Sequence, residues 1–370
     1  MKKTFFWVSL TGFLVCSAGP TYALPRFAAQ TGLKCQSCHI NPSGGGMRQS
    51  FGAKYGREEL PVPTWSKDLG LAEYTTQLTN FLGLGADFRT LYSARQVPDS
   101  SGKTTIQNSF FQMQGDLYLN FRIAKKVSLY LKKGLYSGFE AFGLLNVLPE
   151  SGHIKIGKFL PNYGLKLDDH TAFIRTYTGF SPESGPPELT GLEAAIAPGP
   201  ALIAGGLYNA EDSYGGTGSS KKALLARAEG VFSLSENIHA GIGGNIFRKE
   251  SQNGTTFTLY GAFGSFNIGD LTALGELDAR RSSVSGVSTT AIILYGEVNY
   301  IITPGLVLTA GYDFYDPDKD FKTGAKARYS FGFEFFPISG IEVRPMYRIL
   351  KDEPVELNNN QFDLVFHIYL

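Results

Sequence analysis

From about residue 80 to the C-terminus the chain repeats one pattern, in which polar and apolar side chains alternate over short segments bounded by Gly, Pro, Asn, Asp or Ser. In the final segment, 361–370, every even position is apolar, and the odd positions include Asp363 and His367. A period of two predicts β-strands. Because charges occur deep within the strands, one face is expected to meet lipid and the other a water-filled lumen. A soluble all-β protein with many strands is the alternative.

Sixteen such segments can be placed, and an even count predicts an all-β fold, a closed transmembrane antiparallel β-barrel. The predicted strands are 80–96, 107–123, 127–137, 139–149, 153–160, 189–198, 201–211, 222–233, 238–248, 255–267, 271–282, 289–302, 306–316, 325–336, 340–351 and 360–370. Tight turns alternate with mostly longer polar loops, as periplasmic turns and outer loops do in outer-membrane barrels. Sixteen strands leave a channel, which the long loop 161–188 or the segment before the first strand could fill.

The first residues predict an exported protein. Lys2 and Lys3 precede an apolar stretch, small residues follow it, and cleavage is expected after Ala23. The apolar stretch of about 12 residues is short of the roughly 20 that an N-terminal membrane anchor, the alternative, would need. Residues 1–23 are therefore predicted to be a signal peptide that takes Cys16 with it, which leaves two cysteines in an oxidising compartment.

The charge balance excludes one class of partner. The chain has 34 basic and 33 acidic residues, a formal net charge of +1. The basic residues do not form a concentrated positive region of the kind that would indicate a nucleic-acid partner. After the signal peptide no apolar run reaches about 18 residues, so helical membrane spans are not expected.

The two remaining cysteines form the motif Cys35-Gln36-Ser37-Cys38-His39. Two thiols three residues apart can each add to a vinyl group of one porphyrin, and the adjacent imidazole can ligate its iron. We predict one covalent haem c bound by Cys35, Cys38 and His39; a structural disulfide, a redox pair or another metal are the alternatives. The surrounding segment, 24–69, is too short to bury a core alone. A porphyrin would give it an apolar body to pack on, with contacts expected from Phe27, Leu33, Met47, Phe51 and Tyr55.

The second axial position of the iron has several candidates. Met47 is nearest in sequence, although it could instead pack as an ordinary apolar residue. The strand register predicts that three histidines point inward near the periplasmic rim, namely His153, His239 and His367. The run 168–170, Asp-Asp-His, lies in the long loop; it could bind a metal, but a solvated acidic turn is the preferred interpretation.

The stretches "PRFAAQTGLKCQSCH" and "SFGAKYG", followed by the sixteen-strand count, resemble the fused monohaem cytochrome-porin family of Gram-negative outer membranes. The resemblance implies a signal peptide (1–23), a cytochrome c segment (24–69) on the periplasmic side or in the lumen, and a porin-like barrel (70–370). It also implies electron transfer between a soluble extracellular metal ion, Fe(II) favoured, and periplasmic c-type cytochromes. The triple Gly of "INPSGGGMRQ" departs from the iron-oxidising members. Similar stretches are familiar from barrels of metal-respiring bacteria, which leaves the direction of electron transfer open.

Three functions follow from these residues. The first is an electron-transfer protein in the outer membrane, whose activity could be that of a metal oxidoreductase. The second is a substrate-selective diffusion porin whose N-terminal segment is a plug. The third, weaker interpretation is a haem-based sensor or a scaffold for other cytochromes.

Overall fold

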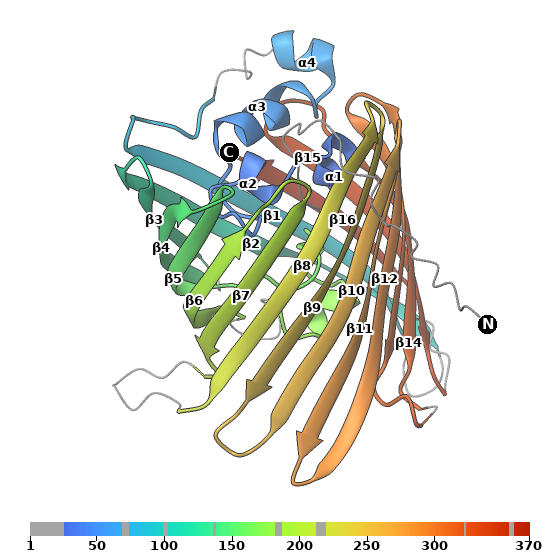
Figure 1. Ribbon diagram of the computed structural model, residues 1–370. Coiled ribbons are helices and arrows are strands. Elements are labelled where there is room, and N and C mark those ends of the chain that lie inside the picture. Colours follow the sequence, from blue (N-terminus) through green and yellow to red (C-terminus); the bar gives the residue numbers. More distant parts are fainter. Residues whose placement is uncertain are drawn as a thin grey trace, which may run out of the picture.

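The computed structural model describes residues 26–68, 74–98, 103–135, 138–181, 187–211, 220–321, 323–354 and 359–370. The predicted signal peptide lies outside these residues. Within them, sixteen antiparallel strands close into one barrel in chain order (Figure 1). The predicted fold class and strand count are therefore confirmed.

The strand boundaries fall within a few residues of those predicted. The strands are β1 (Leu82–Pro98), β2 (Thr104–Ala124), β3 (Val127–Gly134), β4 (Phe139–Leu148), β5 (Gly152–Phe159), β6 (Leu189–Ile196), β7 (Ala201–Asn209), β8 (Lys222–Ser235), β9 (Ile238–Glu250), β10 (Thr256–Ile268), β11 (Leu271–Val284), β12 (Val287–Thr303), β13 (Leu306–Asp316), β14 (Lys326–Phe335), β15 (Ile341–Asp352) and β16 (Gln361–Tyr369). The first strand pairs with the last, with Arg89 opposite His367, so the ladder has no open edge.

The two faces of the wall have the polarity that the alternation predicts. In β16 the apolar Phe366 and Ile368 are exposed on the outside, whereas Asp363 and His367 are each 2% exposed and face the lumen. The barrel thus has an apolar exterior and a charged interior, whereas a soluble sandwich has its apolar side chains inside and its charges outside. The alternation is interrupted in β2, where a register shift opposite Arg89 and Thr90 forms a bulge that the sequence pattern did not reveal, and the register shifts again between Arg122 and Ala124.

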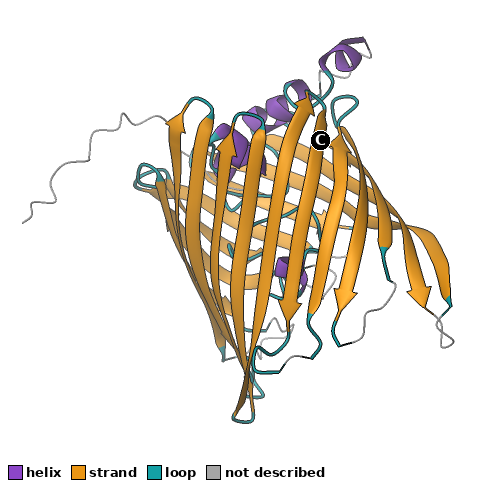
Figure 2. Ribbon diagram, turned by 90° about the vertical axis from the view of Figure 1, so that its right-hand side faces the viewer, coloured by secondary structure: helices purple, strands orange, loops and turns teal. Residues whose placement is uncertain are grey.

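Five short helices complete the described structure: α1 (Arg26–Thr31), α2 (Cys35–Cys38), α3 (Ser50–Glu58), α4 (Pro63–Asp68) and α5 (Phe173–Thr176). Of the helices in the described ranges, none combines the length and the apolar character needed to cross a membrane. Helices α1 to α4 gather at the end of the barrel where the tight turns lie, and α5 lies inside the barrel (Figures 1 and 2).

Two segments fill the lumen, as the sequence suggested. The N-terminal segment enters from the tight-turn end, where α1 contacts β9, β10 and β11. The long connection between β5 and β6 folds inward and carries α5 against β11, β12 and β13. Apolar and aromatic side chains pack around both segments; one cluster includes Ala29, Leu167 and Tyr295, and a second includes Met47 and Tyr130.

Candidate functional site

The Cys-x-x-Cys pair forms a single helical turn, α2, at the barrel mouth. No disulfide joins the two thiols. The backbone N–H of His39 donates to the carbonyl of Cys35 at 2.8 Å, and His39 then leaves the helix in an extended conformation. The motif therefore presents two thiols and an imidazole from one compact turn.

The His39 ring has a defined tautomer. Its Nδ1 lies 3.2 Å from the carbonyl oxygen of Gly46, which can only accept, so Nδ1 carries the proton and the Nε2 lone pair is left for a ligand. Histidines that ligate metals usually donate their other ring nitrogen in this way. Burial, reinforced by the nearby charge of Arg48, lowers the pKa of His39 to about 4. The ring is neutral at pH 7, the form in which imidazole binds iron.

The triple glycine forms the return from His39 to Met47. Gly44, Gly45 and Gly46 all have positive φ, at 88°, 74° and 66°. A Cβ on Gly44 would lie 2.7 Å from the Cys35 sulfur, and one on Gly46 would lie 2.2 Å from the Tyr130 hydroxyl oxygen. Backbone conformation favours glycine at all three positions, and space requires it at Gly44 and Gly46.

Helix α3 packs directly on α2. A Cβ on Gly52 would lie 2.2 Å from the carbonyl oxygen of Cys38, so the two helices touch through backbone. Further along α3, the Tyr369 hydroxyl donates to the carbonyl of Gly56 at 3.4 Å. The small residues of "SFGAKYG" thus let α3 lie between the motif and the barrel wall.

A buried polar network holds the glycine loop to the wall. Ser43 Oγ donates to Glu193 at 3.1 Å and accepts from Lys155 at 2.5 Å. Lys155 and Glu193 form an ion pair of 2.7 Å with both side chains fully buried, and the Tyr208 hydroxyl donates to the same carboxylate at 2.7 Å. A buried charge pair with every partner satisfied fixes one arrangement of loop and wall.

An internal cavity of about 180 Å³ lies beside the motif. Its lining includes both thiols, the His39 ring, and Gly44 and Gly45. The remaining walls come from α1, α3, the inward connection and the barrel, including Phe27, Tyr55, Lys166, Leu167, Leu274, Tyr295, Glu297 and Arg344.

These residues fit a covalently bound haem. Both attachment thiols and the axial imidazole line one space, whose other walls combine aromatic and aliphatic side chains with charged ones. Of the five residues expected to pack on the ring, Phe27 and Tyr55 line the cavity, whereas Phe51 is 47% exposed.

The alternative uses of the thiols are less well supported. Burial raises the pKa of Cys35 to about 12, and it also raises the pKa of Cys38. Redox dithiols and thiolate metal ligands need lowered pKa values. No group of three or more His, Cys, Asp or Glu that could hold a metal ion occurs in the described part of the chain.

The second-ligand candidates are not brought to the cavity. The Met47 side chain is 1% exposed and packs on Gly83 and Gly85 of β1, a placement that counts against an axial role. His367 lies between Glu342, at 2.6 Å, and Asp87, at 3.1 Å, so both of its ring nitrogens are engaged.

The other two rim histidines are buried as well. The Nδ1 atom of His239 is hydrogen-bonded to the Ser233 hydroxyl at 3.0 Å, and the ring packs against Gly32 at the end of α1. His153 is 2% exposed. Within the described residues, none of the three rim histidines lines the cavity that holds the thiols.

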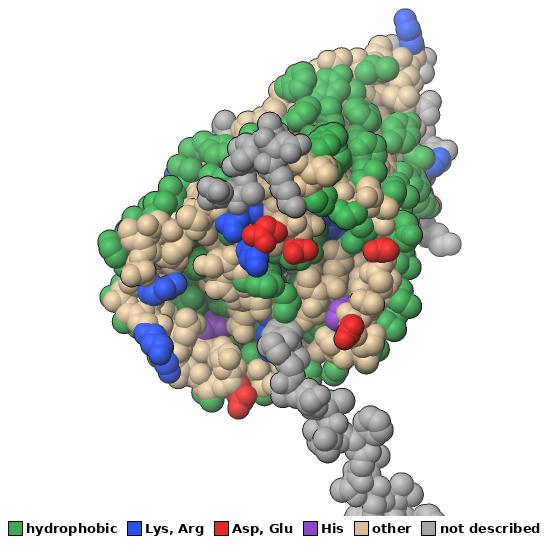
Figure 3. All heavy atoms as spheres, turned by 90° about the horizontal axis from the view of Figure 1, so that it is seen from above, with side chains coloured by type: hydrophobic (Ala, Val, Ile, Leu, Met, Phe, Trp, Pro, Cys, Tyr) green, Lys and Arg blue, Asp and Glu red, His purple; other side chains and the backbone are tan. Residues whose placement is uncertain are grey.

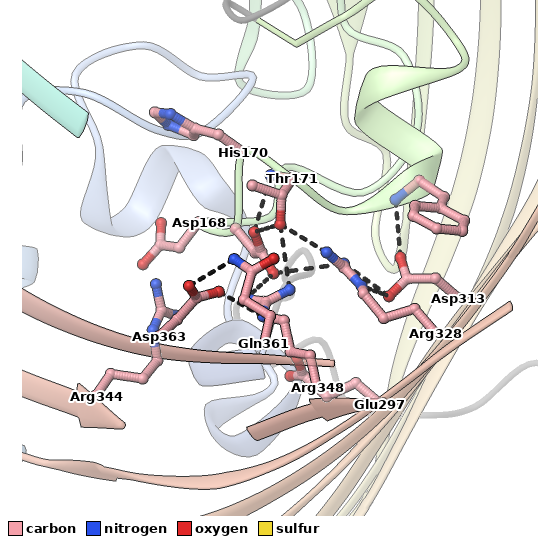
Figure 4. Close-up of polar contacts among 12 residues, drawn as sticks. Asp168, His170, Thr171, Glu297, Asp313, Arg328, Arg344, Arg348, Gln361 and Asp363 are labelled. Atoms are coloured by element: carbon pink, nitrogen blue, oxygen red, sulfur yellow. Dashed lines mark hydrogen bonds and ion pairs between the residues drawn. The ribbon is translucent and has the colours of Figure 1, made fainter. Parts of the chain in front are cut away.

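The long connection is tied to the wall by the loop residues that the sequence marked. Arg348 binds Asp169 at 2.8 Å and Arg328 binds Asp313 at 2.7 Å, and both arginines donate to Thr171 (Figure 4). His170 is 8% exposed. The expected solvated acidic turn is therefore wrong for Asp169 and His170, which lie inside the barrel beside lumenal arginines, whereas the Asp168 side chain is 55% exposed.

Charge also explains the state of Asp168. Burial by itself would raise its pKa, but Arg89, at 3.4 Å, and Arg344 outweigh burial and hold the pKa of this carboxyl well below its usual value. The sequence predicted that charges within the strands face the lumen, but it did not pair the strand arginines with Asp168, because that residue lies in the long connection. It missed Lys155 and Glu193 entirely; their only signal is an inward position on β5 and β6.

Comparison with known proteins identifies the architecture. No protein-family model matches the chain, and no curated protein matches it. Among solved structures it is similar to outer-membrane expressed OmpT of Vibrio cholerae (13% identity, TM-score 0.55, 80% of this chain and 100% of that chain). It is also similar to an anion-selective porin from Comamonas acidovorans (10%, 0.56, 78% and 99%) and to the outer membrane channel DcaP of Acinetobacter baumannii (14%, 0.54, 78% and 97%). At these identities the likeness shows the fold alone, which is that of outer-membrane porins.

Proposed function

We propose that the protein is an outer-membrane electron-transfer protein with one haem c attached through Cys35 and Cys38 and held by His39. One observation carries the proposal: both thiols and the imidazole line a single internal cavity. The Nδ1 hydrogen bond to Gly46, which leaves Nε2 available, supports the same assignment.

The haem would supply one-electron chemistry. The porin-like barrel supports a place in the outer membrane, with the motif at the tight-turn end, which faces the periplasm in such barrels. A periplasmic c-type cytochrome would then exchange electrons at this end, and a soluble metal ion, Fe(II) favoured, would enter from the other. The charged lumen, with Asp87, Asp116 and Glu276 all buried, suits a hydrated ion.

The proposal is tested by the absorption spectrum of the protein after denaturation. A haem c band that survives denaturation is expected for the native chain and for the control Ser37→Ala, a residue that lies between the two cysteines in sequence. Cys35→Ala should lose the covalent band while the barrel stays folded. A colourless native protein would reject the proposal. A redox titration of the haem would then indicate direction, because a strongly positive potential suits oxidation of Fe(II) and a negative one suits reduction of an external acceptor.

A substrate-selective diffusion porin is the second candidate, and the fold shared with known porins favours it. The two segments that fill the lumen count against a wide pore. Swelling of liposomes in sugar solution separates the two candidates: rapid swelling by the native chain, unchanged in Cys35→Ala, would support the porin.

A further inference from the structure

A second, open cleft lies at the tight-turn end, between α2 and the turns that join β2 to β3 and β4 to β5. It has a volume of about 680 Å³, and its lining includes Ser37, His39, Arg122, Lys125 and Lys126. From this end the mouth is hollowed, and basic side chains stand on its left-hand rim (Figure 3).

The cleft has one sign of charge. Arg122, Lys125 and Lys126 line it and are exposed, and none of the described residues that line it is acidic. The chain as a whole is nearly neutral, at +1, so three cations without a carboxylate are a local concentration of charge. A concave surface of one sign focuses its field on a partner of the opposite sign.

The cleft meets the internal cavity at one residue of the motif. His39 lines both spaces, whereas the thiols line only the internal one. A body seated in the cleft would therefore lie beside the residue assigned to the haem iron, outside the barrel.

We propose that this cleft is the docking site of a soluble redox protein with an acidic face, a step that rests on the proposed function above. Three observations support it: exclusively basic charge, an open concave shape and the position of His39. The contact is expected to be weak and dependent on salt, as rim charges govern the association rate more than the lifetime of a complex.

The test uses the full-length protein in zwitterionic-lipid nanodiscs and a soluble acidic c-type cytochrome as the probe. The variant carries Arg122→Gln, Lys125→Gln and Lys126→Gln together. The matched control carries Lys222→Gln, Arg248→Gln and Lys249→Gln, three cations at the opposite end of the barrel, and so has the same net charge. Association is followed by interferometry, and electron transfer by stopped-flow absorbance.

At low ionic strength, the cleft variant should associate with the acidic cytochrome about tenfold more slowly than the native chain. The control should stay within about twofold, and the difference should vanish near 1 M salt, where the Debye length is about 3 Å. A basic cytochrome used as a second probe should show no loss in the cleft variant.

Equal association of the native chain and the cleft variant would overturn the docking site, and so would an equal loss in both variants. Loss of binding to anionic phospholipid vesicles, with cytochrome binding kept, would assign the cations to lipid instead. Interferometry needs no haem, so the two proposals fail separately. A haem band with charge-independent binding rejects docking alone, whereas a missing band with charge-dependent binding rejects only the electron-transfer function.

Discussion

The barrel wall is ordered by its own backbone ladder, whereas the N-terminal segment 26–68 is ordered by what it touches. Each strand pairs with two neighbours, and β1 closes on β16. The segment has helices of 6, 4, 9 and 6 residues, too short to persist alone. Among the described residues, only Ala29, Met47 and Ala53 of this segment are buried and apolar.

The segment compensates with polar anchors around the rim. Arg26 binds Glu334 of β14 at 2.5 Å, Lys34 donates to carbonyls of the turn between β6 and β7, and Arg48 lies over the Tyr369 ring. The segment therefore depends on contacts with the barrel wall for its folded structure. A bound porphyrin would add the apolar core that the segment lacks.

Removing residues 26–68 should separate the two regions most clearly. The strand ladder does not use these residues, so the barrel should fold and its conductance should rise by about tenfold or more as the lumen opens. Planar-bilayer recordings and far-ultraviolet circular dichroism measure the two outcomes. Failure of the shortened chain to form a barrel would show that the wall depends on the segment after all.

Lys155→Met should weaken the junction between the regions. It leaves the Glu193 carboxylate buried without its cation, and breaking such a pair costs about 3–5 kcal/mol in the free energy of unfolding. The control Lys319→Met removes an exposed pair with Asp320, which contributes little to stability. Urea unfolding in micelles compares them; equal losses would mean that the network does not join segment and wall.

The two glycines Gly45 and Gly46 form a matched pair within the segment. Both have positive φ, so alanine costs about 1–2 kcal/mol at either position. At Gly46 the new Cβ also meets the Tyr130 hydroxyl, which adds about 1–3 kcal/mol, whereas nothing lies within 4 Å at Gly45. Gly46→Ala should make the loop the more sensitive of the two to limited proteolysis. Equal digestion of both variants would exclude contact with the wall as the cause.

The last effect expected is a pH dependence of the free energy of unfolding. Burial, followed by repulsion from Lys155, lowers the pKa of Lys166 from 10.5 to about 7. Between these values the unfolded chain holds a proton that the folded chain lacks, so the free energy of unfolding should rise as the pH rises from about 7 to 10.5.

Lys166→Met should remove this rise, and Lys222→Met, an exposed control, should keep it. Unfolding measured at several pH values compares the slopes. The same slope in all three proteins would place Lys166 in contact with solvent.

Features that depend only on residues close together in the sequence could be predicted from the sequence. Alternation in β14 and β16 fixes which side chains face outward, and the bounding turns fix where each strand ends, because strand geometry repeats every two residues. The signal in Cys35, Cys38 and His39 is equally local, since three functional groups lie within five positions. The haem assignment stays a prediction.

Contacts across the lumen were decided by closure of the barrel. Ser43 comes from the glycine loop, whereas Lys155, Glu193 and Tyr208 come from three neighbouring strands, and no sequence pattern pairs the loop with them. The inward path of the long connection, which removed Asp169 from solvent, and the packing of Met47 on β1 have the same origin. Local chemistry set the period, the turns and the motif, whereas the partner of each buried charge depends on which strands the closed ladder brings face to face.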